Sequence, residues 1–122
     1  MIQLPFSFTG TLTYTPYSGA NPQNIGINVS GNFSSKSDDK YELVGAVTKA
    51  IDFGSVGAAG AKAILVIYDQ GLSPVTLQIG TENLELKAGS SFLYLNTNPT
   101  TGITAANLIS TVDASLRAFV LG

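Results

Sequence analysis

The sequence predicts an all-β protein, a single jelly-roll-like β-sandwich of eight to ten short antiparallel strands. Three observations support this prediction. Apolar and polar residues alternate over much of the 122-residue chain, which is typical of strands with one buried face. Turn-forming residues recur roughly every 8–12 positions, as they do in sandwiches and barrels. A helical period is weak throughout, and the best helical candidate is the short stretch 104–109.

The N-terminal segment predicts a strand with a bend in it. Its alternating apolar residues are Ile2, Leu4, Phe6 and Phe8, and the pattern continues at Leu12 and Tyr14. Pro5 cannot donate a ladder hydrogen bond, so residues 1–9 are expected to form an edge strand or an arm. Gly10 is expected to mark a bend or bulge.

The middle of the chain predicts further short strands separated by polar loops. Residues 15–24 are dense in turn formers and predict a loop, after which strict alternation over 25–33 predicts a strand. The charged run SSKSDDK at 34–40 predicts a polar loop. A strand over 41–47, a short strand or turn over 46–53 and a flexible connection over 54–60 complete this part.

The C-terminal half opens with the continuous apolar run AILVIY at 63–68. Such a run is typical of a strand covered on both faces. Asp69-Gln70-Gly71 is expected to turn the chain, because Asp and Gly favour turns. Strands are predicted around 75–79, 84–86, 92–95 and 108–120, with a loop at 96–102. No linker separates a second domain, so the whole chain is expected to form one unit.

The composition argues against several kinds of chemistry. The chain contains neither Cys nor His, which removes disulfides and the commonest metal ligand and general acid/base. The sequence offers no candidate catalytic, cofactor-binding or metal-binding residues, and it predicts a protein that is not an enzyme. Its six basic residues are scattered, whereas nucleic-acid and membrane partners select basic clusters. No signal peptide is expected, because the start lacks a basic region followed by a long apolar one.

The same composition favours association with other protein chains. Only 11% of the residues are charged, against about 25% in typical domains. Charged side chains are depleted in interface cores because their desolvation is costly. The sequence therefore predicts a homo-oligomer. Its expected assembly arm consists of Ile2, Leu4, Phe6 and Phe8.

Some local motifs suggest binding sites but match their patterns poorly. The glycine-rich run 54–60 before Lys62 lacks the adjacent Gly-Lys of a phosphate loop. Asp38, Asp39 and Glu42 do not have the spacing of an EF-hand loop. Tyr14 and Tyr17 are candidate docking aromatics for a sugar or a protein, although capping of a core rim is the more common role for such tyrosines.

The second half of the chain resembles a known class of proteins. The residues that carry the resemblance are IDFG at 51–54, AILVI at 63–67, PVTLQIG at 74–80, LELKAG at 84–89 and LYL at 93–95. They resemble small β-sandwich virion proteins of tailed bacteriophages, although Ala88-Gly89 stands where such proteins often have Pro-Gly. The resemblance implies a structural virion protein, such as a capsid decoration, head-fibre or neck and tail subunit. It also implies major capsid or tail proteins as partners and the virion as location.

An alternative function stays open at this point. A carbohydrate- or receptor-binding β-sandwich module would use Tyr14, Tyr17 and the loop 96–102. The absence of Trp removes the aromatic side chain that would best anchor a sugar.

Overall fold

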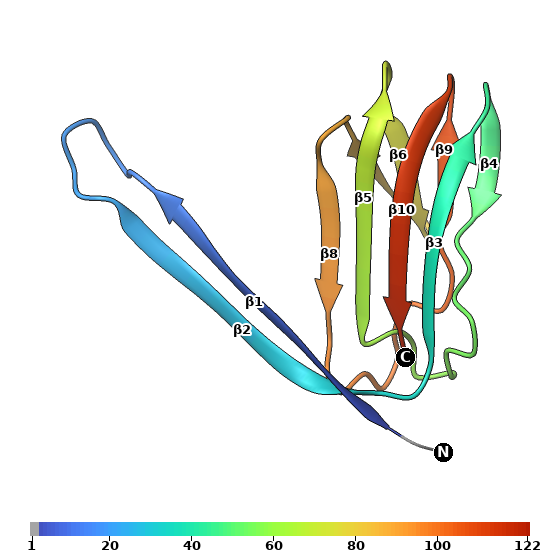
Figure 1. Ribbon diagram of the computed structural model, residues 1–122, viewed down its shortest axis with the longest axis horizontal. Coiled ribbons are helices and arrows are strands. Elements are labelled where there is room, and N and C mark those ends of the chain that lie inside the picture. Colours follow the sequence, from blue (N-terminus) through green and yellow to red (C-terminus); the bar gives the residue numbers. More distant parts are fainter. Residues whose placement is uncertain (1–2) are drawn as a thin grey trace.

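The computed structural model describes residues 3–122, which form ten strands and no helix (Figure 1). All strand pairs are antiparallel. The all-β prediction and its strand number are therefore confirmed. The strands are β1 (Leu4–Tyr14), β2 (Gln23–Phe33), β3 (Lys36–Leu43), β4 (Val47–Ala50), β5 (Ala63–Gly71), β6 (Val75–Ile79), β7 (Glu82–Leu86), β8 (Ser91–Leu95), β9 (Asn107–Ser110) and β10 (Ala114–Leu121).

Strands β3 to β10 form a body of two packed sheets (Figure 1). One sheet has the order β3-β10-β5-β8 and the other has the order β4-β9-β6-β7. The first and last strands of the body, β3 and β10, are neighbours in one sheet, and the next pair inward along the chain, β4 and β9, are neighbours in the other. The chain therefore wraps around itself from both ends. This strand order is that of a jelly roll, with two Greek keys in two sheets.

The core lies between the two sheets and follows the two-residue period of the strands. On β5, Ile64, Val66 and Tyr68 point inward and are almost fully buried. Leu65 and Ile67 on the outer face are only half-buried. The expectation that this strand is covered on both faces is therefore correct for one face and only partly met on the other. The remaining fully buried large side chains are Val75, Leu77, Leu108, Leu116 and Val120.

Strands β1 and β2 lie outside this body and form a hairpin that we call the arm. They pair over their full length, from Leu4 opposite Phe33 to Tyr14 opposite Gln23. Figure 1 shows the arm leaving the lower end of the body and diverging from it toward the tip at residues 15–22. The expected one-stranded arm over residues 1–9 is thus part of a two-stranded ribbon. Ile2, its first proposed residue, lies outside the described residues.

The predicted bend or bulge at Gly10 is absent from β1. The register runs through Gly10 without a shift. A Cβ at this position would lie 3.2 Å from a ring carbon of Phe8. Gly10 therefore leaves room for the Phe8 ring to lie along the strand, and the missing side chain serves packing instead of bending.

The base of the arm is tied to the body by hydrogen bonds. The backbone N–H groups of Ser34 and Ser35 donate to the C-terminal Gly122 carbonyl, at 2.8 and 3.2 Å. The Lys62 ammonium donates to the Asn32 carbonyl at 2.7 Å. The arm is therefore anchored at one end only, because these tethers lie at its base.

Two predicted loops turn out to be strands. The charged run 34–40 is mostly β3, because its residues alternate: Ser37 faces the core side and Asp38 faces solvent. An edge strand tolerates such charges on its outer face. The turn predicted at 69–71 lies instead at 72–74, and β5 continues to Gly71. The Tyr68 hydroxyl donates to the Ser73 carbonyl at 2.6 Å, which fixes the later turn.

The helix considered at 104–109 is also wrong. Residues 107–110 form β9, which pairs with β4 on one side and with β6 on the other. A central strand buries one face and satisfies its backbone on both edges. Tertiary pairing therefore overrides the weak local pattern here.

Candidate interaction surfaces

The arm is an amphipathic ribbon with one apolar and one polar face. In an antiparallel pair, directly opposed residues project from the same face. Phe8 opposes Val29 and Leu12 opposes Ile25, whereas Thr9 opposes Asn28. The apolar face is made of Leu4, Phe6, Phe8, Leu12, Tyr14, Ile25, Ile27, Val29 and Phe33, together with Gly10, Gly31 and Gln23. The polar face is made of Pro5, Ser7, Thr9, Thr11, Thr13, Asn24, Gly26, Asn28, Ser30 and Asn32.

The distal half of the apolar face is open to solvent. Leu12 is 62% exposed and Ile25 is 50% exposed. Ile27 and Tyr14 are 44% and 45% exposed. These four residues are called the distal apolar face below. Clusters of exposed apolar side chains on a soluble protein commonly mark interaction sites.

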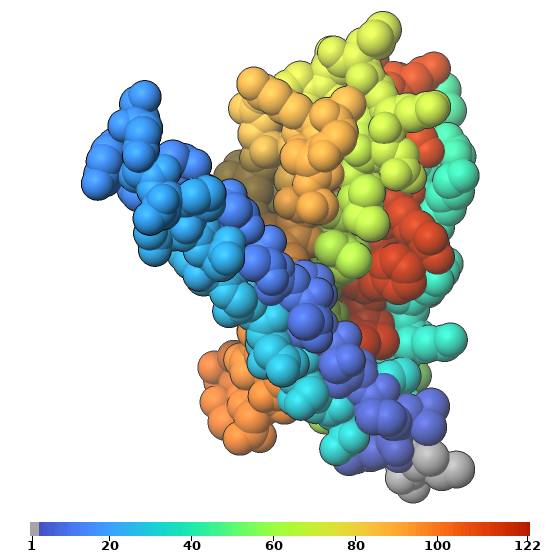
Figure 2. Space-filling model, turned by 60° about the vertical axis from the view of Figure 1, so that its left-hand side comes forward, coloured from blue at the N-terminus to red at the C-terminus, as the bar shows by residue number. Residues whose placement is uncertain are grey.

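The proximal half of the apolar face packs toward the body. Phe6 and Phe8 are half-buried, and the Phe6 ring lies 6.3 Å from the ring of Phe33. Between them and the outer face of the β5 sheet is a groove of about 200 Å³. Figure 2 shows the arm crossing in front of this side of the body. The groove is lined by Phe6, Ser7, Phe8, Ala63, Leu65, Leu93, Leu95, Phe119 and Leu121.

The arm also differs from the body in charge. Residues 1–35 contain no Asp, Glu, Lys or Arg, so all fourteen charged side chains belong to residues 36–122. Charged side chains on exposed strands commonly prevent unwanted pairing. The arm lacks that protection, and its surface offers only apolar contacts and neutral hydrogen bonds.

The proposed docking aromatics do not form one site with the loop 96–102. Tyr14 continues the distal apolar face, and Tyr17 lies in the loop at the tip, 71% exposed. Thr97 instead lies near Gly31, close to the base of the arm. The two aromatics and the loop are thus at opposite ends of the ribbon.

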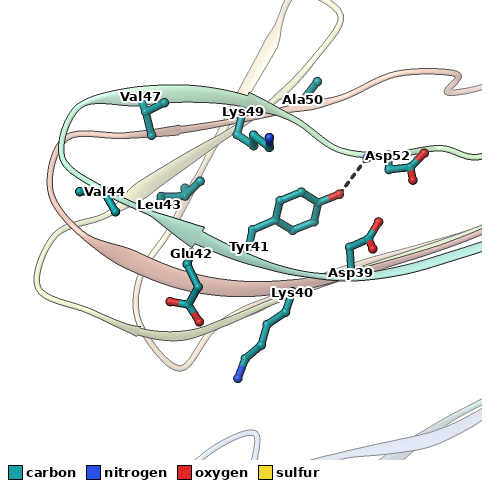
Figure 3. Close-up of a pocket in the computed structure, with 10 residues that line it drawn as sticks. All are labelled: Asp39, Lys40, Tyr41, Glu42, Leu43, Val44, Val47, Lys49, Ala50 and Asp52. Atoms are coloured by element: carbon teal, nitrogen blue, oxygen red, sulfur yellow. Dashed lines mark hydrogen bonds between the residues drawn. The ribbon is translucent and has the colours of Figure 1, made fainter.

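A second surface is the cleft between the edge strands β3 and β4 (Figure 3). It has a volume of about 640 Å³. The Tyr41 ring lies along the cleft and points toward Asp52, whose backbone N–H donates to the Tyr41 hydroxyl at 2.8 Å. Burial raises the pKa of Tyr41 above its ordinary value. The lining residues are Asp39, Lys40, Tyr41, Glu42, Leu43, Val44, Val47, Lys49, Ala50 and Asp52.

The charged residues of this region serve structure and do not converge on a ligand site. Asp38 accepts two hydrogen bonds from Arg117, at 3.1 and 3.0 Å, which lower the pKa of Asp38. Asp39 projects from the opposite face and accepts from the Ser37 hydroxyl at 3.0 Å. Within residues 3–122, no three acidic side chains gather in positions that could hold a metal ion. Lys62, the second residue after the glycine-rich run 54–60, donates to the Asn32 carbonyl.

Comparisons with known proteins give this chain no family. No family model matches it, and no curated protein matches it. A solved structure of a putative ethanolamine utilization protein Q from Salmonella typhimurium LT2 matches 95% of this chain and 97% of its own, with 9% identity and a TM-score of 0.37. At this level of similarity the match assigns no activity. Residues 3–122 contain no helix that is long and apolar enough to span a membrane.

The interpretation as a bacteriophage virion protein is corrected by this comparison. The solved structure described above is a putative ethanolamine utilization protein and not a capsid decoration, head-fibre or tail subunit. The quoted motifs, such as AILVI at 63–67 and LELKAG at 84–89, are each a strand or a strand with its turn. Such motifs recur in any jelly roll, because the two-residue period and the turn residues are what the fold itself requires.

Proposed function

We propose that this protein is a non-enzymatic, self-associating subunit whose arm binds a second copy of the chain. The observation that carries the proposal is the distal apolar face, which consists of Leu12, Tyr14, Ile25 and Ile27. A two-stranded hairpin is at best marginally stable alone in water. An arm anchored only at its base therefore needs a covering surface to hold its distal half in this conformation.

Association would cover this face at a useful gain in free energy. Complete burial of a large aliphatic side chain contributes about 1.5–3 kcal/mol, and each of these residues is about half exposed. Each would thus contribute about 1 kcal/mol when covered. A second copy is a suitable partner because its arm is equally uncharged and apolar, and because closed homo-oligomers are the commonest soluble assemblies.

The chemistry of the described residues supports a binding role over catalysis. The chain has no His or Cys. The cleft between β3 and β4 holds Tyr41, whose hydroxyl oxygen accepts from the backbone N–H of Asp52 and ties the loop after β4 to β3. This arrangement stabilises the body without positioning a nucleophile beside a base.

The test uses two adjacent residues on opposite faces of β2. Ile25→Asp places a carboxylate on the distal apolar face, whereas Asn24→Asp places the same charge on the polar face. We expect Ile25→Asp to shift the oligomer to monomer in sedimentation-velocity runs, and Asn24→Asp to leave its mass unchanged. Because solvent surrounds both positions in the monomer, circular dichroism should show the same folded body in both variants.

Two results would contradict the proposal. A wild-type protein that sediments as a monomer across the micromolar range has no self-association to explain. Equal dissociation of both variants would show that added charge, and not the apolar face, controls the assembly.

A further inference from the structure

The arm and the body together define how two copies can fit, and this inference rests on the proposed self-association. The apolar face of the arm is turned toward the outer face of its own sheet, since Phe6 and Phe8 line the groove with Leu65 and Phe119. Toward the tip the arm diverges from the sheet (Figure 1). The distal apolar face therefore borders a wedge that is closed at the base and open at the tip.

We propose an interlocked two-fold dimer in which each arm enters the wedge of the partner and the two apolar faces meet. In this arrangement the layers follow the order sheet, partner's arm, own arm, partner's sheet. The apolar face of each arm looks toward its own sheet, so the two apolar faces point at each other in the middle. A two-fold axis makes the arms antiparallel, with each tip directed at the base of the other arm.

The polar faces also find suitable neighbours in this arrangement. The Ser, Thr and Asn face of each arm would lie on the outer face of the partner's sheet, near its upper end. That end presents Ser91, Asp69 and Ser115. Neutral hydroxyl and amide groups can pair with these side chains without desolvating a charge of their own.

The area of such a contact is at the lower end of what a stable dimer needs. A residue on one face of a sheet covers about 33 Å², from the strand spacing and the two-residue repeat. The distal part of the arm, residues 9–14 and 23–28, therefore presents about 200 Å² on each face by the same spacing. Both faces of one arm and the area of its own sheet that the partner's arm covers give about 600 Å² per copy, against about 600–1,000 Å² per partner in standard interfaces.

Pairing of the arms edge to edge fits the structure less well. At the base, Pro5 lacks a donor on β1, and Lys62 occupies the Asn32 carbonyl on β2. Both edges are thus blocked where the arm begins. Edge pairing would also leave Leu12 and Ile25 in water, whereas packing of the two faces covers them.

The absence of cysteine makes the geometry testable in the full-length protein, because one introduced Cys is the only thiol in each chain. Leu12→Cys and Ile27→Cys place the thiol on the apolar face near the proposed axis. Thr11→Cys places it on the polar face at the same height, and Ser18→Cys places it at the tip. Each variant is treated with a short bis-maleimide and analysed on a denaturing gel.

We expect more than half of the chains to be linked as a covalent dimer in Leu12→Cys and in Ile27→Cys. In Thr11→Cys and Ser18→Cys the linked fraction should be less than a tenth as large. If the protein sediments as an oligomer but neither apolar-face variant is linked, the two-fold arrangement is wrong and the self-association stands. Strong linkage through Ser18→Cys would likewise overturn it in favour of tip-to-tip contact. A monomeric wild-type protein would remove both the inference and the proposed function.

Discussion

The arm and the body share the same alternating strand pattern, but the apolar face is buried in the body and exposed on the distal arm. In the body, alternation points Ile64, Val66 and Tyr68 into a core that a second sheet covers. In the arm, alternation points Leu12 and Ile25 at solvent. The local sequence signal is equally regular in both, so an alternating strand identifies which face is apolar and does not say what covers it.

This difference explains why the two regions should respond differently to mutation. Removing a side chain from the body takes away contacts that hold the monomer together. In the proposed dimer, removing one from the distal arm takes away contacts that the partner supplies. Folding stability and assembly can therefore be separated by measurements on matched residues.

The largest effect is expected from a pair of leucines. Leu116 is fully buried and Leu12 is mostly exposed. Leu116→Ala leaves a cavity in the core and should lower the free energy of unfolding by about 2–5 kcal/mol, measured by urea denaturation. Leu12→Ala should change it by less than about 0.5 kcal/mol in the monomer while weakening association. Equal losses in both variants would mean that the arm is as much a part of the folded core as β10.

A smaller loss should follow from a single added methyl group in the body. A Cβ at Gly71 would overlap the Tyr68 hydroxyl, with 1.9 Å between the two atoms. Gly71→Ala should displace Tyr68 from the Ser73 carbonyl and lower the free energy of unfolding by about 1–3 kcal/mol. Gly26 in the arm has open space around it, so Gly26→Ala is the matched control and should leave thermal unfolding unchanged.

The smallest effect is expected at the cleft between β3 and β4. Tyr41→Phe removes the acceptor of the Asp52 N–H and should lower the free energy of unfolding by about 1 kcal/mol. Because burial raises the pKa of Tyr41 in the folded protein, its contribution is present below the ordinary tyrosine pKa of about 10 and is lost as pH rises through the higher folded pKa. Urea denaturation between about pH 9 and pH 11, around that ordinary value, should show a steeper decline in the free energy of unfolding for the wild type than for Tyr41→Phe. If the free energy of unfolding declines with equal slope in both proteins, the alkaline sensitivity belongs to a group other than Tyr41. Tyr17→Phe, which removes an exposed hydroxyl from the arm, is the control and should decline as the wild type does.

Much of the fold could be predicted from local residues. Alternation over 25–33 and 75–79 identified strands, and the run 63–68 identified a central strand. The prediction of strands and loops failed where the local residue types favoured one structure and the tertiary contacts favoured another. Residues 34–40 looked like a loop because they are charged, yet a charged outer face is acceptable on the edge strand β3. The turn at 69–71 was misplaced because the Tyr68 hydroxyl selects the Ser73 carbonyl, a contact without a local sequence signal.

The candidate interaction surface was only partly predictable. Leu4, Phe6 and Phe8 were correctly grouped on one face, and Pro5 correctly marked an edge. Their partner strand was not foreseen, because pairing of β1 with β2 requires the long loop 15–22 to close and nothing local specifies that register. The resemblance to virion proteins misled because it rested on motifs that any jelly roll needs.

The period of two, the positions of most strands and the uncharged character of the first 35 residues are all evident in the amino-acid sequence. These properties depend only on neighbouring side chains and on composition. Two further features follow only from the folded chain: the first two strands leave the body as a paired arm, and Phe6 and Phe8 close the base of a wedge. Those outcomes depend on long-range register and on the tethers from Lys62 and Gly122, which bring together residues far apart in the chain. An apolar face exposed on such an arm is therefore a property of the fold, and the surface that covers it is what the proposed dimer supplies.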